Sequence, residues 1–256
     1  MMFSRDELIE ITGAVVLKDE VSPESIFAIS TDTRTITNND IYLPLKGVSF
    51  DGENFIDKAL EAGSIAYFTT KDNIIEHAKL VLKVENTLDA YLKIAQYFRL
   101  KNNPITVGIT GSSGKTTTKE IVASTLESKY KVFKTPLNHN NEVGLCQTIF
   151  EMPDDTEVLV LEMGMRGLGE IELLSKYAEP DITIVSNVGT AHIGRLGRRE
   201  NIEKAKEPLY SSKESTERAG LGFTIMEVFT DTLEVKSAVN VGTSVYMLKK
   251  YYEKAA

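Results

Sequence analysis

The chain has 256 residues, enough for two domains, and its 42% hydrophobic and 26% charged residues are typical of a soluble globular protein. Its formal net charge of −8 argues against nucleic acid as a general partner, and no apolar run is long enough to span a membrane. The single cysteine, Cys146, excludes an internal disulfide, suits a cytoplasmic location and is expected to be a small buried residue.

The first hundred residues predict a small α/β domain. Ser4 and Glu7 have the spacing of a capping box before Leu8 and Ile9, which predicts a short first helix. Strand-like runs and helical periods then alternate: strands are expected at 26–30, 41–45 and 65–69, and helices at 55–62 and 87–101. The segment 102–104, Asn-Asn-Pro, follows as a domain boundary.

A polar turn lies between the first two of these strands. Its hydroxyl and charged groups could hold a phosphorylated ligand together with the Lys-Gly pair that follows the second strand. The residues concerned are Ser30, Thr31, Asp32, Arg34, Lys46 and Gly47. Taken alone, a solvated turn with a surface ion pair explains them better than a ligand site does.

Residues 105–118 have the pattern of a strand, a phosphate-binding loop and a helix, with the spacing Gly-x-x-Gly-x-x-Gly-Lys-Thr. The backbone N–H groups of such a loop surround an anionic oxygen, and the helix N-terminus adds its positive dipole end. Lys115 would reach the outer phosphates, and the Thr116 hydroxyl would bind Mg²⁺. The predicted nucleotide site therefore consists of Gly111, Ser112, Ser113, Gly114, Lys115, Thr116 and Thr117.

Strands and helices continue to alternate after this loop, which predicts a parallel sheet covered by helices. Helices are expected from the loop to about 129, at 143–150 and at 169–178, and strands at 132–134, 157–162 and 181–186. Ligands of such sheets sit beyond the carboxyl ends of the strands, where Thr116, Glu162 and His192 are all expected. An acidic residue there suits Mg²⁺, although a structural carboxylate and a hydrogen-bonded turn histidine remain alternatives.

Several motifs, in this order along the chain, resemble the Mur ligase family. They are the phosphate loop, the run Asn-x-Asn-Asn-Glu-Val-Gly at 138–144, the segment 161–171 and the run Asn-Val-Gly-Thr-Ala-His at 187–192. The segments 30–34 and 46–52 resemble that family's N-terminal domain, which holds a uridine nucleotide. The resemblance covers residues 1 to about 206, with two small departures: Cys146 replaces a usual proline, and Glu53 stands where histidine is frequent.

This resemblance implies an ATP-dependent ligase of peptidoglycan precursor synthesis, with ATP and Mg²⁺ as cofactors. ATP would phosphorylate the terminal carboxylate of UDP-N-acetylmuramoyl-tripeptide, and the amine of D-alanyl-D-alanine would attack the acyl phosphate.

The resemblance also implies roles for particular residues. Glu162 and His192 resemble the family's metal ligands, and Asn138 and Asn141 lie where the family contacts the UDP-sugar. Lys206 matches a carbamylated catalytic lysine that supports a second Mg²⁺, although a surface lysine is the alternative.

The Mur ligase pattern is lost after Lys206. Residues 207–256, with strand-like runs at 232–237 and 243–248, resemble the C-terminal end of a sporulation anti-sigma factor of the GHKL ATPase superfamily. The expected organisation is therefore an α/β UDP-substrate domain at 1–103, an incomplete parallel-sheet ATP-binding domain at 104–206 and an α+β foreign tail. Such a chain is expected to be incomplete and inactive alone.

Two other functions stay open at this point. The tail would belong to an ATP-binding anti-sigma kinase fragment with a sigma factor as partner, although the Asn and glycine boxes of that superfamily are absent from the sequence. Alternatively, the chain would bind a UDP-sugar without turnover.

Overall fold

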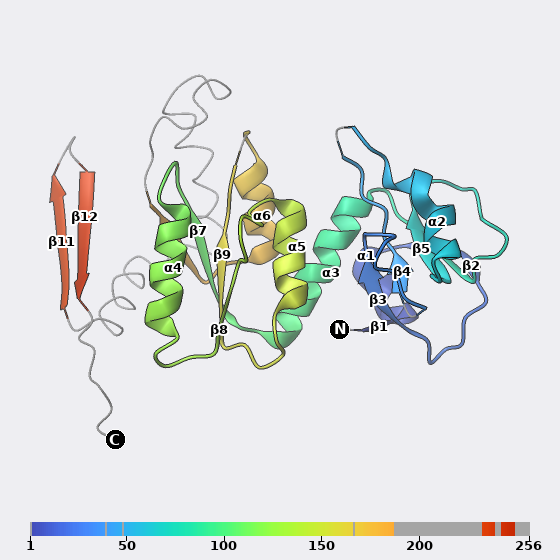
Figure 1. Cartoon of the computed structure of the whole chain (residues 1–256), viewed down its shortest axis with the longest axis horizontal. Helices are drawn as coiled ribbons and strands as arrows, with labels where there is room; N and C mark the ends of the chain where they lie inside the picture. The colour runs from blue at the N-terminus through green and yellow to red at the C-terminus, as the bar shows by residue number, and fades with distance from the viewer. Residues whose placement is uncertain are drawn as a thin grey trace. The chain divides into compact units, whose positions relative to one another are not determined.

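The computed structural model describes residues 2–38, 40–47, 49–165 and 167–186, and the backbone of two later strands. The chain divides into two compact units, residues 1–101 and 102–256 (Figure 1). Among the described residues, no helix is both long and apolar enough to cross a membrane.

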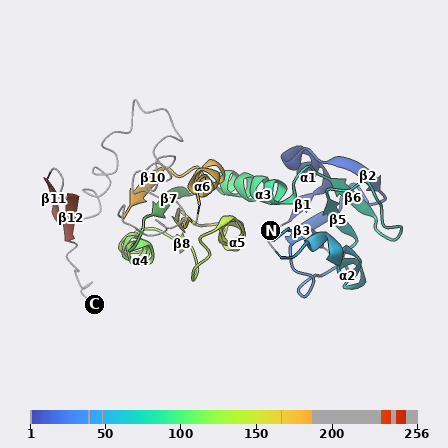
Figure 2. The same ribbon diagram turned by 90° about the horizontal axis from the view of Figure 1, so that it is seen from above.

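The first unit is built on a six-stranded sheet with the order β1-β3-β4-β5-β6-β2. The four central strands run parallel, and β1 and β2 pair antiparallel at the edges. Helices α1 and α2 lie on opposite sides of this sheet in Figure 2. The elements are β1 (Phe3–Ser4), α1 (Arg5–Thr12), β2 (Val15–Asp19), β3 (Ile26–Ser30), β4 (Asp40–Tyr42), the 3₁₀ helix η1 (Gly52–Phe55), α2 (Ile56–Glu61), β5 (Ala66–Thr69), β6 (Leu80–Lys83) and α3 (Thr87–Asn102).

Local signals in this unit set where the first helix begins and where it ends. The Ser4 hydroxyl accepts from the Glu7 N–H at 3.2 Å, and the Glu7 carboxylate accepts from the Ser4 N–H at 2.9 Å, so the predicted capping box is confirmed. Gly13 ends α1 in the left-handed conformation, with φ +68°.

Three differences from the sequence prediction occur in the first unit. The helix expected at 55–62 begins as the 3₁₀ turn η1, and the strand expected at 41–45 ends at Tyr42. Strands β1, β2 and β6 were not predicted. The buried face of α2 packs on Tyr42, Tyr67 and Val81, which brings β4, β5 and β6 into one core.

The second unit confirms the predicted parallel sheet, with the order β10-β7-β9-β8 and every pairing parallel. Helices α4 and α6 cover opposite sides of it (Figure 2). The elements are β7 (Ile105–Thr110), α4 (Lys115–Leu126), β8 (Val132–Lys134), α5 (Glu142–Glu151), β9 (Val158–Glu162), α6 (Glu170–Ala178) and β10 (Ile182–Val185). Helix α4 ends three residues earlier than expected, and Cys146 is fully buried, which raises the pKa of its thiol.

The two strand-like runs of the tail are confirmed as β11 (Thr232–Ala238) and β12 (Gly242–Leu248), which pair antiparallel. His192 and Lys206 lie outside the described residues.

Candidate functional site

The phosphate loop joins the end of β7 to the start of α4, as the sequence predicts. Gly114 is the N-cap of α4 and adopts the left-handed conformation with φ +78°, where a side chain would be strained. The Lys115 ammonium donates to the Gly111 carbonyl at 2.9 Å, so this side chain lies back across its own loop. The Ser186 hydroxyl donates to the Ser113 carbonyl at 2.6 Å and ties the end of β10 to the loop.

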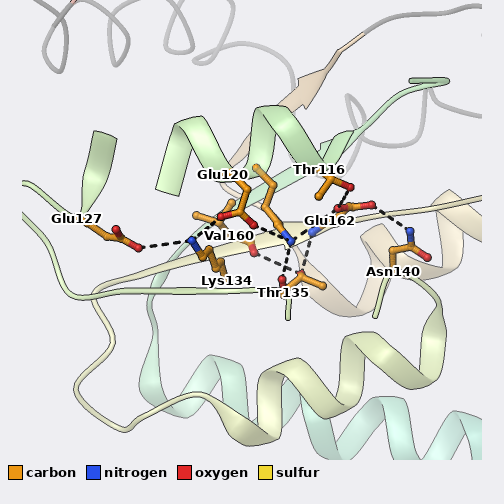
Figure 3. A network of polar contacts seen from close by, with 9 residues as sticks. Thr116, Glu120, Glu127, Lys134, Thr135, Asn140, Val160 and Glu162 are labelled. Atoms are coloured by element: carbon orange, nitrogen blue, oxygen red, sulfur yellow. Dashed lines mark hydrogen bonds and ion pairs between the residues drawn. The ribbon is translucent and has the colours of Figure 1, made fainter. Parts of the chain in front are cut away.

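Glu162, the last residue of β9, is the centre of the polar network next to this loop (Figure 3). Its side chain is buried, with the residue 4% exposed. The Thr116 hydroxyl donates to Glu162 Oε2 at 2.9 Å, and Asn140 Nδ2 donates to Glu162 Oε1 at 3.0 Å. Two of the three predicted metal ligands are therefore in direct contact, although they are 46 residues apart in sequence.

Lys119 supplies the positive charge on the inner side of Glu162. Lys119 is only 2% exposed. Its ammonium donates to the Thr135 carbonyl at 2.8 Å and lies 3.9 Å from Glu162 Oε2. The Thr135 hydroxyl in turn accepts from the Glu162 N–H at 2.9 Å. A buried charge is tolerated when it is paired and hydrogen-bonded, and these contacts meet that condition.

Sequence reasoning missed Lys119, although a signal was present. The buried residues of α4 are Lys119, Ala123 and Leu126, which are spaced as i, i+4 and i+7. A lysine at an apolar position of an amphipathic helix indicates a buried charge with a partner.

The network continues outward along β8. Lys134 lies 2.6 Å from Glu120 and 3.8 Å from Glu127 (Figure 3). Hydrogen bonds from Lys134 and Lys119 lower the pKa of the Glu120 carboxyl. This outer part fixes α4 against β8 but does not reach the phosphate loop.

The donor set beside the loop fits a hard divalent cation. A hydroxyl oxygen of Thr116 and a carboxylate of Glu162 lie within 2.9 Å of each other, and Mg²⁺ takes few protein oxygens when phosphates and water complete its shell. Among the described residues there is no cluster of three or more His, Cys, Asp or Glu side chains that would form a closed metal site.

The asparagine-rich loop between β8 and α5 contributes at the same edge of the sheet. Asn141 caps α5, because its side-chain oxygen accepts from the Gly144 N–H at 2.9 Å. Gly144 is required there, since an added Cβ would lie 2.5 Å from the His139 backbone. Asn138 is exposed in this loop. Asn138 and Asn141 flank Asn140 in the chain, and Asn140 contacts Glu162.

The candidate residues of the first unit lie at or after the carboxyl ends of β3 and β4. The backbone N–H of Leu43 donates to the Ser30 carbonyl at 2.8 Å, which joins the two segments. Arg34 forms a bidentate ion pair with Asp32, with N···O distances of 2.9 and 2.5 Å. These hydrogen bonds lower the pKa of the Asp32 carboxyl to about 2. Lys46 lies 3.8 Å from Asp51 with 77% of its side chain exposed.

Glu53 connects the end of a third strand, β5, to the candidate residues of the first unit. Its Oε1 accepts from the Thr70 N–H at 2.6 Å, and its Oε2 lies 2.9 Å from the Lys71 ammonium. Burial by itself would raise the pKa of Glu53, but the hydrogen bonds from Lys71 and Thr70 outweigh it and the pKa is lowered. Glu53 therefore ties η1 to the end of β5.

Two family descriptions match the sequence. "Mur ligase middle domain" matches residues 109–241, and "Mur ligase family, catalytic domain" matches residues 25–104. The first match extends past Lys206, where the resemblance seen in the sequence ends.

Curated relatives and solved structures agree with these matches. The UDP-N-acetylmuramoyl-tripeptide–D-alanyl-D-alanine ligase of Bacillus subtilis is 39% identical over 199 residues, which is 77% of this chain and 43% of the relative. The Synechocystis enzyme of the same name is 46% identical over 70% of this chain and 39% of its own length. This chain thus spans less than half the length of either relative.

Among solved structures, MurF from Acinetobacter baumannii matches 97% of this chain and 61% of its own length, with a TM-score of 0.78 and 26% identity. MurF ligase from Thermotoga maritima, in complex with ADP, has a TM-score of 0.69 and 29% identity, and the match covers 88% of this chain and 58% of that one. On the family matches and these relatives, the chain belongs to the Mur ligase family.

Proposed function

We propose that this chain carries the UDP-substrate-binding and nucleotide-binding parts of an ATP-dependent ligase that joins D-alanyl-D-alanine to UDP-N-acetylmuramoyl-tripeptide. The observation that supports it most is the contact between Thr116, at the start of α4, and Glu162, at the end of β9, next to a phosphate loop. The relatives that bear this enzyme's name support the choice of substrates.

The proposed chemistry uses the chain's residues mainly for positioning and charge neutralisation, which is most of what phosphoryl transfer requires. Residues 111–117 would receive the ATP phosphates on backbone N–H groups. Lys115 would exchange its contact with the Gly111 carbonyl for the outer phosphates. Thr116 and Glu162, with His192, would hold a Mg²⁺ ion, which offsets phosphate charge when bound.

The remaining predicted residues would bind the UDP-substrate or support a second metal ion. Asn138 and Asn141 would contact the sugar portion of the UDP-substrate, and Lys206, once carbamylated, would support a second Mg²⁺. The uridine nucleotide would bind at the first unit's strand ends, at Ser30, Thr31, Asp32, Arg34, Lys46 and Gly47. Arg34 and Lys46 are exposed and could exchange their present carboxylate partners for ligand phosphate.

The test measures binding, because this chain spans less than half the length of the curated relatives and we expect no D-alanyl-D-alanine-dependent phosphate release from it. Calorimetry with ADP and Mg²⁺ should show binding by the wild type. Lys115→Ala should weaken it by at least roughly tenfold, which corresponds to the loss of a charge-assisted contact.

The matched control is Lys129→Ala, which removes an exposed lysine after the C-terminal end of α4 and should leave nucleotide affinity unchanged. A second titration with UDP-N-acetylmuramoyl-tripeptide separates a ligase part from a UDP-sugar binder. Binding of the UDP-sugar without any binding of ADP and Mg²⁺ would overturn the ligase proposal.

A further inference from the structure

Asn140 is the one residue of the asparagine-rich loop whose side chain reaches the carboxylate of Glu162 in the described structure, and it was not among the predicted site residues. Its Nδ2 donates to Glu162 Oε1 at 3.0 Å, and its backbone carbonyl accepts from the Gly164 N–H at 2.7 Å. Side chain and backbone of one residue therefore connect the loop after β8 to the end of β9. Figure 3 shows the side-chain contact.

The two oxygens of Glu162 have different surroundings. Oε2 accepts from the Thr116 hydroxyl and lies 3.9 Å from the buried Lys119 ammonium, whereas Oε1 accepts from Asn140. The terminal torsion of a glutamate is broad and nearly free when nothing holds it. Hydrogen bonds to both oxygens remove that freedom and fix the plane of the carboxylate beside Thr116.

We propose that Asn140 is a positioning residue, which orients Glu162 toward the cation and ties loop 135–141 to the nucleotide site. The inference rests on the proposed function, in which Glu162 and Thr116 hold a cation beside the phosphate loop. Partners that orient a metal ligand from outside its coordination shell commonly change metal affinity or activity by roughly 10- to 100-fold.

Gly164 supplies the space for this amide. A Cβ added at Gly164 would lie 2.8 Å from Asn140 Cγ and Oδ1 and 3.0 Å from Nδ2. Gly164 is not among the described residues with positive φ, so an alanine there meets no backbone strain and would instead push aside the amide of Asn140. A substitution at Gly164 therefore disturbs the hydrogen bond while both of its partners stay in the chain.

The first experiment titrates ADP into the whole chain with and without Mg²⁺, for the wild type, Asn140→Ala and Gly164→Ala. In both variants the gain in ADP affinity that Mg²⁺ provides should fall by roughly tenfold. Affinity for ADP without Mg²⁺ should stay the same, because the phosphate loop is intact. A merely structural role would lower both affinities together.

The control is Asn73→Ala, which removes an exposed asparagine of the first unit and should keep the wild-type dependence on Mg²⁺. Thermal melts of each variant check folding, and Gly164→Ala carries the test if Asn140→Ala does not fold. If a folded variant gains as much ADP affinity from Mg²⁺ as the wild type does, the inference about Asn140 is overturned but the proposed function is not. No binding of ADP and Mg²⁺ by the wild type would overturn the proposed function, and the inference with it.

The second experiment follows amide hydrogen exchange in loop 135–141. ADP with Mg²⁺ should slow exchange in the wild-type loop. When both proteins are saturated with ADP and Mg²⁺, this slowing should be absent from Asn140→Ala. ADP without Mg²⁺ should have little effect on the loop. Equal slowing in the wild type and the variant would overturn the proposed tie between the loop and the cation site.

Discussion

The two units use ion pairs in opposite ways at their candidate sites. In the second unit, Lys119 and Glu162 are 2% and 4% exposed and come from different elements. In the first unit, Arg34 and Asp32 are two residues apart, with 81% and 37% of their side chains exposed. Desolvation makes the buried pair costly to break, and solvent makes the exposed pair easy to exchange.

This difference fits the two proposed tasks. A carboxylate that serves a cation beside a phosphate loop needs a fixed direction, which the contacts with Thr116 and Asn140 provide. An arginine that binds a ligand phosphate must leave its resting partner, and an exposed pair allows this at small cost. Three of the four measurements below probe this comparison and one tests backbone strain in loop 135–141; they begin with the largest expected effect.

Lys119→Met should lower the free energy of unfolding by about 3 kcal/mol, because it leaves Glu162 and the Thr135 carbonyl without their buried cation. Methionine keeps most of the buried volume, so the loss reports charge and hydrogen bonding. Urea unfolding followed by circular dichroism measures it. The control Lys129→Met, at an exposed position, should change stability little. If Lys119→Met loses no more stability than Lys129→Met, the buried ion pair of the second unit is no costlier to break than an exposed one.

Glu53→Gln tests a buried carboxylate in the first unit, and we expect a loss of about 1 kcal/mol at neutral pH. Because folding lowers the pKa of Glu53 below its ordinary value of 4.5, its charge stabilises the fold above that pH. This stabilisation is lost as the pH falls through the lowered pKa. The difference between wild type and variant should therefore shrink on acidification.

Urea unfolding from neutral to acidic pH measures this difference for Glu53→Gln, with the exposed Glu61→Gln as the matched control. A difference that is constant across the pH range would show that the charge of Glu53 has no part in the stability of this unit.

Leu137→Asn should raise stability by roughly 0.5 to 1 kcal/mol. Leu137 has φ +47° and is 80% exposed, so its left-handed backbone is unfavourable and little buried apolar contact is lost. Asparagine accepts that conformation more readily. Leu168→Asn is the matched control, since Leu168 is 64% exposed and has no positive φ. Equal melting shifts in the two variants would argue against strain at Leu137.

Arg34→Ala should change the free energy of unfolding by less than about 0.5 kcal/mol, because both partners of this pair face solvent. Its affinity for UDP-N-acetylmuramoyl-tripeptide should nevertheless fall if Arg34 receives the ligand's phosphate. Unfolding and calorimetry on the same preparation measure both. A stability loss close to that of Lys119→Met would mean that exposure does not distinguish the two pairs.

Much of the local structure could be predicted from short stretches of sequence. The capping box of α1 and the phosphate loop before α4 depend on neighbouring residues, so each can be recognised within a few positions. The alternation of strands and helices after Ile105 likewise determined that the second sheet is parallel, because parallel strands need crossover helices.

Only the tertiary structure decided which side chains meet. Thr116 and Glu162 are 46 residues apart, Asn140 and Glu162 are 22 apart, and Lys119 and Thr135 are 16 apart. Their contacts depend on the order and register of β7, β9 and β8, which no local period encodes. Sequence alone therefore determined the phosphate loop and the acid at the end of a strand. The partners of that acid, Lys119 and Asn140, were decided by folding, because burial and hydrogen bonding select them from across the sheet.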